Sequence, residues 1–168
     1  MRNGNEEGSI KMSDDLIFIT PEDNRWYDLE DLPNEKWTNV TDYEGLYSVS
    51  NYSRIKHLPK FKNSREFIMK PYRDNWGRYT VCLWKNAKKK MMFVHRLVGM
   101  EFIPNPEHKP EINHLKPVTK LLCDNRVCNL MWATSSENSQ WTKLCGNLYQ
   151  PSLGKFGKDH HMSKRVVQ

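Results

Sequence analysis

Short runs of alternating apolar and polar residues, broken by glycine and asparagine turns, fill the middle of this 168-residue chain. Residues 44–50 contain a glycine turn and then alternate as a half-buried strand does, and residues 54–56 resume the alternation with basic side chains. Residues 78–84 are rich in β-forming side chains and precede a second such run at 91–94. We interpret the charged residues 85–90 between them as a hairpin loop. The middle third is therefore predicted to be a small antiparallel sheet.

Helical spacing appears further along the chain. Residues 95–102 place apolar side chains at helical intervals. Two short strands are then predicted at 112–115 and 129–134, separated by a loop. The capping-box arrangement Thr134-Ser135-Ser136-Glu137 predicts the start of a second helix, which ends before Gly146. Together with the sheet, these elements indicate an α+β protein.

Charge divides the chain into two unequal parts. Residues 1–35 hold ten acidic and three basic side chains, a net charge of −7, and residues 36–168 hold 10 acidic and 23 basic side chains, a net of +13. Such a surplus favours a polyanionic partner, most commonly nucleic acid, over a merely solvated surface. The short apolar run 16–19 can add an edge strand to an otherwise polar, partly flexible acidic extension.

The composition also indicates where in the cell the protein is expected to act. No apolar run approaches the length that spans a membrane, and the first ten residues contain no apolar signal core. The four cysteines are few, and we interpret them as reduced thiols. We therefore expect a cytoplasmic protein, either phage-encoded and acting in a host cell or otherwise intracellular, with no membrane partner.

One histidine and two asparagines between residues 112 and 138 offer groups that phosphodiester hydrolysis needs. The reaction requires an activated water, a cation on the phosphate and stabilisation of the departing 3′ oxygen. His114 lies on the first predicted strand, Asn129 opens the second, and Asn138 falls in the first turn of the capped helix. A hairpin packed on a helix can bring these positions together, although their spacing alone is a weak signal.

Several short blocks in a fixed order make the signal stronger, because residues 94–138 resemble the HNH endonucleases, particularly the phage and intron-encoded homing group. The matching blocks are Val94-His95-Arg96-Leu97-Val98, Phe102-Ile103-Pro104-Asn105-Pro106, Ile112-Asn113-His114, Asn129-Leu130-Met131-Trp132-Ala133-Thr134 and Glu137-Asn138. Upstream, the segments 37–51 and 54–56 resemble the nuclease-associated modular DNA-binding motif that commonly precedes such domains. The resemblance covers about residues 36–140.

The resemblance implies a role for each candidate residue. His114 is the general base that takes a proton from water, and Asn129 holds the loop and orients His114. Asn113 and Asn138 ligate Mg²⁺ through their side-chain oxygens, and Mn²⁺ can substitute. The chain departs from the family pattern in carrying the neutral Asn113 where some members have Asp. It also carries residues 115–120 in place of an Asp-Gly turn.

These departures keep other functions open. The leading hypothesis is a metal-dependent endonuclease that cuts or nicks double-stranded DNA as a monomer. A DNA-binding protein with a degenerate, inactive HNH centre is the alternative. A zinc-stapled interaction module is a third, since Cys123 and Cys128, with Cys145 and His160-His161 later, are candidate zinc ligands. The paired C-x-x-C spacing is missing, however, and we favour free or buried thiols.

Four regions follow from this interpretation: an acidic extension (1–35), a basic β-sheet DNA-binding module (36–94), an HNH ββα-metal nuclease domain (95–145) and a basic tail (146–168). Basic side chains interleaved with aromatic ones are predicted to contact DNA. They are Arg54, Lys56, Arg73, Arg78, Lys88, Lys89 and Arg96. Residues 162–168 resemble the opening strand of a helix-turn-helix module, which suggests a shortened chain. His95 opens a helix, where a phosphate contact and a packing role are equally open.

Overall fold

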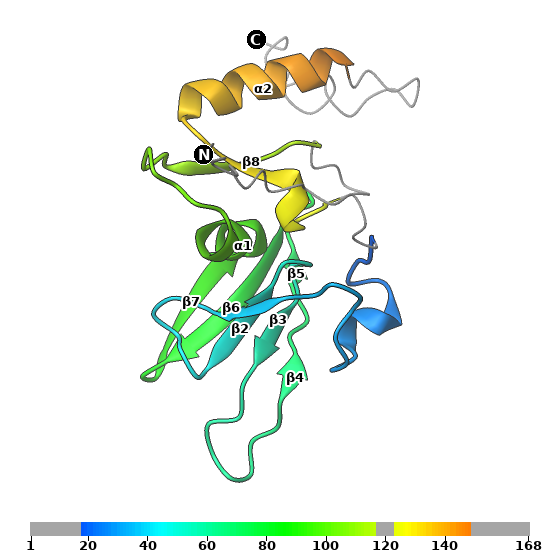
Figure 1. The fold of residues 1–168 in the computed structure, drawn as a ribbon, viewed down its shortest axis with the longest axis vertical. Coiled ribbons are helices and arrows are strands. Elements are labelled where there is room, and N and C mark those ends of the chain that lie inside the picture. Colours follow the sequence, from blue (N-terminus) through cyan, green and yellow to red (C-terminus); the bar gives the residue numbers. More distant parts are fainter. Residues whose placement is uncertain (1–17, 117–122, 149–168) are drawn as a thin grey trace, which may run out of the picture.

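The computed structural model describes residues 18–116 and 123–148, which form antiparallel sheets and two α-helices (Figure 1). The first sheet has the order β1-β2-β3-β4, formed by β1 (Trp37–Asn39), β2 (Tyr47–Ser50), β3 (Ile55–His57) and β4 (Phe67–Ile68). The second has the order β5-β6-β7, formed by β5 (Tyr72–Arg73), β6 (Tyr79–Lys85) and β7 (Lys88–Phe93). The predicted single sheet is therefore two sheets.

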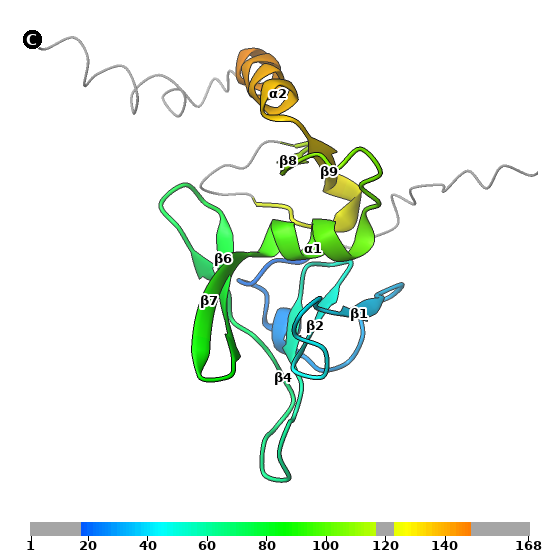
Figure 2. The ribbon, with the colours of Figure 1, turned by 90° about the vertical axis from the view of Figure 1, so that its left-hand side faces the viewer.

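A helix, a hairpin and a second helix follow the sheets. They are α1 (Val94–Phe102), β8 (Glu111–His114), β9 (Leu130–Ala133) and α2 (Ser135–Leu148), with short 3-10 helices η1 (Asn24–Tyr27) and η2 (Val127–Asn129). In Figure 2, α1 lies between the larger sheets and the β8–β9 hairpin, and α2 lies beyond the hairpin. The predicted α+β class, an antiparallel module followed by a ββα unit, is confirmed. None of the helices in the described ranges is long and apolar enough to cross a membrane.

The capping box that predicted the second helix is present in the structure. The hydroxyl of Thr134 accepts a hydrogen bond from the Glu137 amide at 3.2 Å, and the Glu137 carboxylate accepts one from the Thr134 amide at 2.7 Å. These two bonds satisfy amides that have no partner within the helix, which fixes where α2 begins.

The charged segment 85–90 is not a loop, contrary to the prediction. Lys85 pairs with Lys88 across the β6–β7 ladder, and only Asn86 and Ala87 form the turn, with φ values of 52° and 59°. Two consecutive residues with positive φ match the twist of the flanking strands, so the hairpin closes after two residues. The lysines that follow therefore extend along β7.

One apolar core joins the sheets to the hairpin. It combines Val49 of β2 and Val81 of β6 with Leu97 of α1, Ile112 of β8 and Leu130 of β9. At the closest approach of α1 to β8, a Cβ on Gly99 would lie 2.0 Å from Cδ1 of Ile112. A larger residue at this position would require the Ile112 side chain to shift. The boundary predicted at residue 94 thus falls inside a continuous core.

Arg54 is fully buried in this fold, so its side chain is not placed where the predicted DNA contact needs it. Its side chain is fully buried and forms an ion pair with the equally buried carboxylate of Glu35. Its guanidinium also donates to the backbone carbonyls of Trp26, Asp28 and Glu30 at 2.6 to 3.2 Å. A buried charge needs such partners. Arg54 therefore fastens the described part of the acidic extension onto the first sheet.

Candidate active site

The β8–β9 hairpin presents two chemically different faces. Successive side chains of a strand point to opposite faces. Ile112 and His114 are buried toward α1, where Ile112 meets Gly99 and the ring of His114 lies 5.1 Å from that of His95. Glu111 and Asn113 lie on the other face, which α2 covers.

His114 is held by its surroundings at the end of β8. Its side chain is almost entirely buried, its ring Nε2 lies 2.8 Å from Oδ1 of Asn125, and its backbone carbonyl accepts a hydrogen bond from Nε1 of Trp141 at 3.1 Å. Burial lowers the pKa of His114, and the hydrogen bond to Asn125 opposes that shift in part. The imidazole is therefore neutral near pH 7 and can accept a proton.

Asn125 is the residue that sequence reasoning missed. Its side-chain oxygen can only accept hydrogen bonds, so Nε2 of His114 must carry the hydrogen and Nδ1 the lone pair. Cys123 donates to the same oxygen at 3.4 Å. The polar run Asp124-Asn125-Arg126 in the loop after His114 is the available signal. By residue type alone, however, it does not separate Asn125 from Asn129.

Asn129 acts on the loop that connects β8 to β9. Its Oδ1 accepts from the backbone amide of Lys116 and its Nδ2 donates to the backbone carbonyl of Asp124, both at 2.8 Å. One buried side chain therefore ties together the two ends of the loop. The predicted contact with the loop is present, but the partner of the His114 ring is Asn125.

The two predicted metal ligands lie on the α2 side of the hairpin. Asn113 lines an open groove with Met131 and Trp141, and Nδ2 of Asn138 donates to Oε2 of Glu111 at 2.5 Å. Glu111 and Asn113 are two residues apart on the same face of β8. Asn113 and Asn138 therefore lie on the same side of the hairpin, whereas the ring of His114 lies on the opposite face.

The donor set on this face suits a hard cation. Asn113 and Asn138 carry side-chain amide oxygens, and Mg²⁺ prefers oxygen ligands. The bond from Nδ2 of Asn138 to Glu111 leaves the side-chain oxygen of Asn138 free of that contact. The residues present therefore fit a divalent ion of this class.

The zinc alternative gains no support. Within residues 18–116 and 123–148, no group of three or more His, Cys, Asp and Glu side chains is placed to hold a metal. Cys123 packs in the apolar core, where burial raises its pKa to about 11, and burial also raises the pKa of Cys128. The histidines 160 and 161 lie outside the described residues.

The predicted DNA contacts differ in how exposed they are. Lys88 and Lys89 are exposed on β7. Lys56 lies 4.2 Å from the Trp37 ring centroid and pairs with Glu66 at 3.3 Å, which leaves 13% of its side chain exposed. Lys56 is therefore largely occupied within the first sheet, whereas the β7 lysines face solvent.

The three arginines other than Arg54 among the predicted contacts each have a partner within the protein. Arg73 approaches Glu22 at 3.8 Å, Arg78 pairs with Asp74 at 3.0 Å, and Arg96 donates to the backbone carbonyl of Pro110 at 3.4 Å. Arg73 and Arg78 remain partly exposed, with 28% and 41% of their side chains accessible. These contacts orient the arginines without removing Arg73 and Arg78 from the surface.

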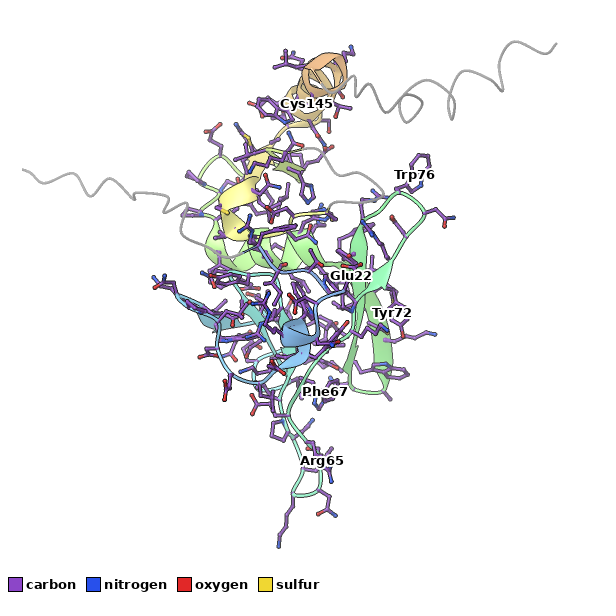
Figure 3. The ribbon with its side chains drawn as sticks, turned by 90° about the vertical axis from the view of Figure 1, so that its right-hand side faces the viewer. Glu22, Arg65, Phe67, Tyr72, Trp76 and Cys145 are labelled. Atoms are coloured by element: carbon purple, nitrogen blue, oxygen red, sulfur yellow. The ribbon has the colours of Figure 1, made fainter. Side chains whose placement is uncertain are left out.

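Exposed aromatic side chains accompany the basic residues of the second sheet. Tyr72, Trp76 and Trp84 are each more than half exposed. In Figure 3, Trp76 projects from the end of the β5–β6 connection nearer to the hairpin, whereas Arg65 lies in the β3–β4 loop, towards the opposite end of the molecule. Aromatic and cationic side chains on one sheet are typical of nucleic-acid interfaces.

Comparison with known proteins finds a NUMOD4 motif and similarity to HNH endonucleases. Residues 35–84 match the NUMOD4 motif. The chain is 32% identical over 133 residues to the DNA endonuclease I-HmuI of Bacillus phage SP01, which covers 79% of this chain and 71% of that protein. A solved structure of DNA binding and cleavage by the HNH homing endonuclease I-HmuI matches with a TM-score of 0.56 and 28% identity, over 66% of this chain and 59% of that one.

Two uncharacterized HNH endonucleases of Acanthamoeba polyphaga mimivirus are also similar. One is 32% identical over 93 residues and the other 36% identical over 112 residues, which cover 55% and 64% of this chain. The chain spans only about a quarter of their length, 27% and 26% respectively.

Proposed function

This chain belongs to the HNH homing endonuclease family, and from that premise we propose that it is a metal-dependent DNA endonuclease with His114 as its general base. The observation that carries the proposal is the contact between Nε2 of the buried His114 ring and Oδ1 of Asn125 at 2.8 Å. It fixes the neutral tautomer in which Nδ1 holds the lone pair. A base in this state is what the attack of water on a phosphodiester requires.

In the proposed reaction, Nδ1 of His114 takes a proton from a water molecule as its oxygen attacks the phosphorus. The bond from phosphorus to the 3′ oxygen breaks, and that oxygen leaves. Mg²⁺ bound by Asn113 and Asn138 would neutralise charge on the phosphate and the departing oxygen, and Mn²⁺ would substitute. His114 ends β8 directly after Asn113, so the proposed base and one proposed metal ligand are sequence neighbours at the end of this strand.

The proposed substrate is double-stranded DNA, bound by a monomer in the cytoplasm. The net charge of +13 on residues 36–168 supports a polyanionic substrate. One active centre per monomer makes single-strand nicking the natural first product.

Incubation of supercoiled plasmid carrying candidate target sites with the protein and Mg²⁺ or Mn²⁺ tests the proposal. Conversion to nicked or linear plasmid that stops on chelation supports a metal-dependent nuclease. DNA binding without cleavage under either metal would favour a DNA-binding protein with an inactive centre.

Loss of the Asn125 side chain is expected to slow cleavage. Asn125→Ala removes the acceptor that fixes the His114 tautomer and should lower kcat about 10- to 100-fold with little change in KM for DNA. Asn125→Asp retains an acceptor and should lose less. Asn39→Ala, at an exposed position of β1, is the control. Single-turnover cleavage of a labelled duplex measures the rates, and equal rates for the Asn125→Ala and Asn39→Ala proteins would contradict the assignment.

Loss of two β7 lysines is expected to weaken DNA binding in a salt-dependent manner. Each phosphate contact contributes about 0.9 to the slope of log K against log salt concentration, so Lys88→Ala with Lys89→Ala should reduce that slope by about 1.8. The matched control replaces the exposed Lys60 and Lys62 of the β3–β4 loop. Fluorescence anisotropy across a salt series gives both slopes. An identical slope for the two double variants would place the interface elsewhere.

A further inference from the structure

One carboxylate joins the first strand of the hairpin to the start of α2. Oε2 of Glu111 accepts a hydrogen bond from Nδ2 of Asn138, and Oε1 accepts one from the hydroxyl of Ser135, each at 2.5 Å. Glu111 lies on the same face of β8 as Asn113. It therefore contacts one of the two proposed metal ligands and lies two residues from the other.

The contact determines how the Asn138 carboxamide is turned. The nitrogen and oxygen of a carboxamide sit on opposite sides of the same carbon, and either end can face a given neighbour unless a hydrogen bond selects one. A carboxylate accepts hydrogen bonds and donates none, so it selects the NH₂ end. The oxygen of Asn138 must then face away from Glu111, where it is available to a cation.

We propose that Glu111 is a positioning residue for the metal site: it holds the Asn138 carboxamide in the orientation that presents its oxygen to a divalent cation. This inference rests on the proposed function. A carboxylate that binds the hydrogen of a ligand also increases electron density on the ligating atom, and partners of this kind strengthen metal binding. The effect matters here because Asn113 and Asn138 are both uncharged.

A simpler role in capping α2 does not account for these contacts. The start of the helix is already satisfied by the reciprocal bonds between Thr134 and Glu137. Glu111 instead reaches the side chains of Ser135 and Asn138, and it comes from a neighbouring strand. Both of its oxygens are engaged by the protein, which favours positioning over direct ligation.

Mn²⁺ titration of the protein bound to uncleaved duplex DNA tests the proposal. His114→Ala keeps the DNA intact, and the fall in the electron paramagnetic resonance signal of free Mn²⁺ reports binding. In this background Glu111→Ala should weaken Mn²⁺ affinity about 10- to 100-fold. The control Glu107→Ala removes an exposed carboxylate that pairs with Lys109 and should leave the affinity unchanged.

A double-mutant cycle separates positioning from the other roles. If Glu111 acts through Asn138, adding Glu111→Ala to Asn138→Ala should cause no further loss of Mn²⁺ affinity. A further loss of the same size would make Glu111 a ligand in its own right and overturn the proposal. A lowered Tm with Mn²⁺ affinity equal to that of the Glu107→Ala control would reduce Glu111 to a structural role.

Failure of the proposed function gives a different pattern. If the wild-type protein binds Mn²⁺ in a Glu111-dependent manner but cleaves no duplex, the positioning role stands and the nuclease assignment falls. If the protein with His114→Ala as its only change binds no Mn²⁺ on DNA, both are overturned.

Discussion

Replacing His114 with alanine is expected to lower the rate of DNA cleavage by about 10²- to 10⁴-fold, the contribution typical of a positioned general base. The buried ring is held by Asn125 on Nε2, which leaves the lone pair for proton transfer on Nδ1. DNA affinity should be retained, because the exposed predicted phosphate contacts Lys88 and Lys89 lie on the second sheet. Single-turnover cleavage and anisotropy measure the two quantities separately.

A second histidine variant controls for general effects of the substitution. His108 is exposed and adopts a positive φ of 51°, a conformation that asparagine tolerates, so His108→Asn should cleave at the wild-type rate. Far-UV circular dichroism and a thermal melt check that the His114→Ala protein is folded. If a folded His114→Ala protein cleaves within tenfold of the wild-type rate, His114 is not the base.

Local signals were sufficient to predict most of the elements. The capping box fixed the start of α2 because its hydrogen bonds are made within four residues. The helical spacing of residues 95–102 similarly predicted α1. The β6–β7 hairpin loop was predicted too long, because a run of six residues with four lysines resembles a loop. The two positive-φ residues Asn86 and Ala87 that close it carry no strong turn signature as a pair.

The candidate site was predicted less completely, because its contacts cross long stretches of sequence. The resemblance supplied His114, Asn113 and Asn138, but Asn125 and Asn129 are chemically identical. Only the fold shows that Asn125 reaches the imidazole and Asn129 ties the loop. The face on which each side chain lies depends on strand register. Register is why His114 is buried toward α1 while its neighbour Asn113 faces α2.

The burial of Arg54 could not be predicted from the sequence for the same reason, because its partner lies far away along the chain. From the sequence it is one of several basic residues beside a sheet, and the partner that removes it from the surface, Glu35, lies 19 residues away. Both side chains have no exposed surface, and the guanidinium is further satisfied by backbone carbonyls of the acidic extension. This buried cluster therefore contributes to the stability of the folded module.

Glu35→Ala is accordingly expected to destabilise the protein by about 3–5 kcal/mol, because it leaves the Arg54 charge buried without its counter-ion. Glu66→Ala, which removes the partly exposed partner of Lys56, is the control and should cost less than about 1 kcal/mol. Urea unfolding followed by tryptophan fluorescence measures both, since Trp26 and Trp37 lie beside the cluster. The two variants lose the same charge, but Glu35 is buried and also accepts a hydrogen bond from the Leu32 amide, whereas Glu66 is partly exposed. Equal free energies of unfolding for the two variants would show that Arg54 reaches solvent or another anion when Glu35 is absent. The conclusion that Arg54 holds the acidic extension in place would then be wrong.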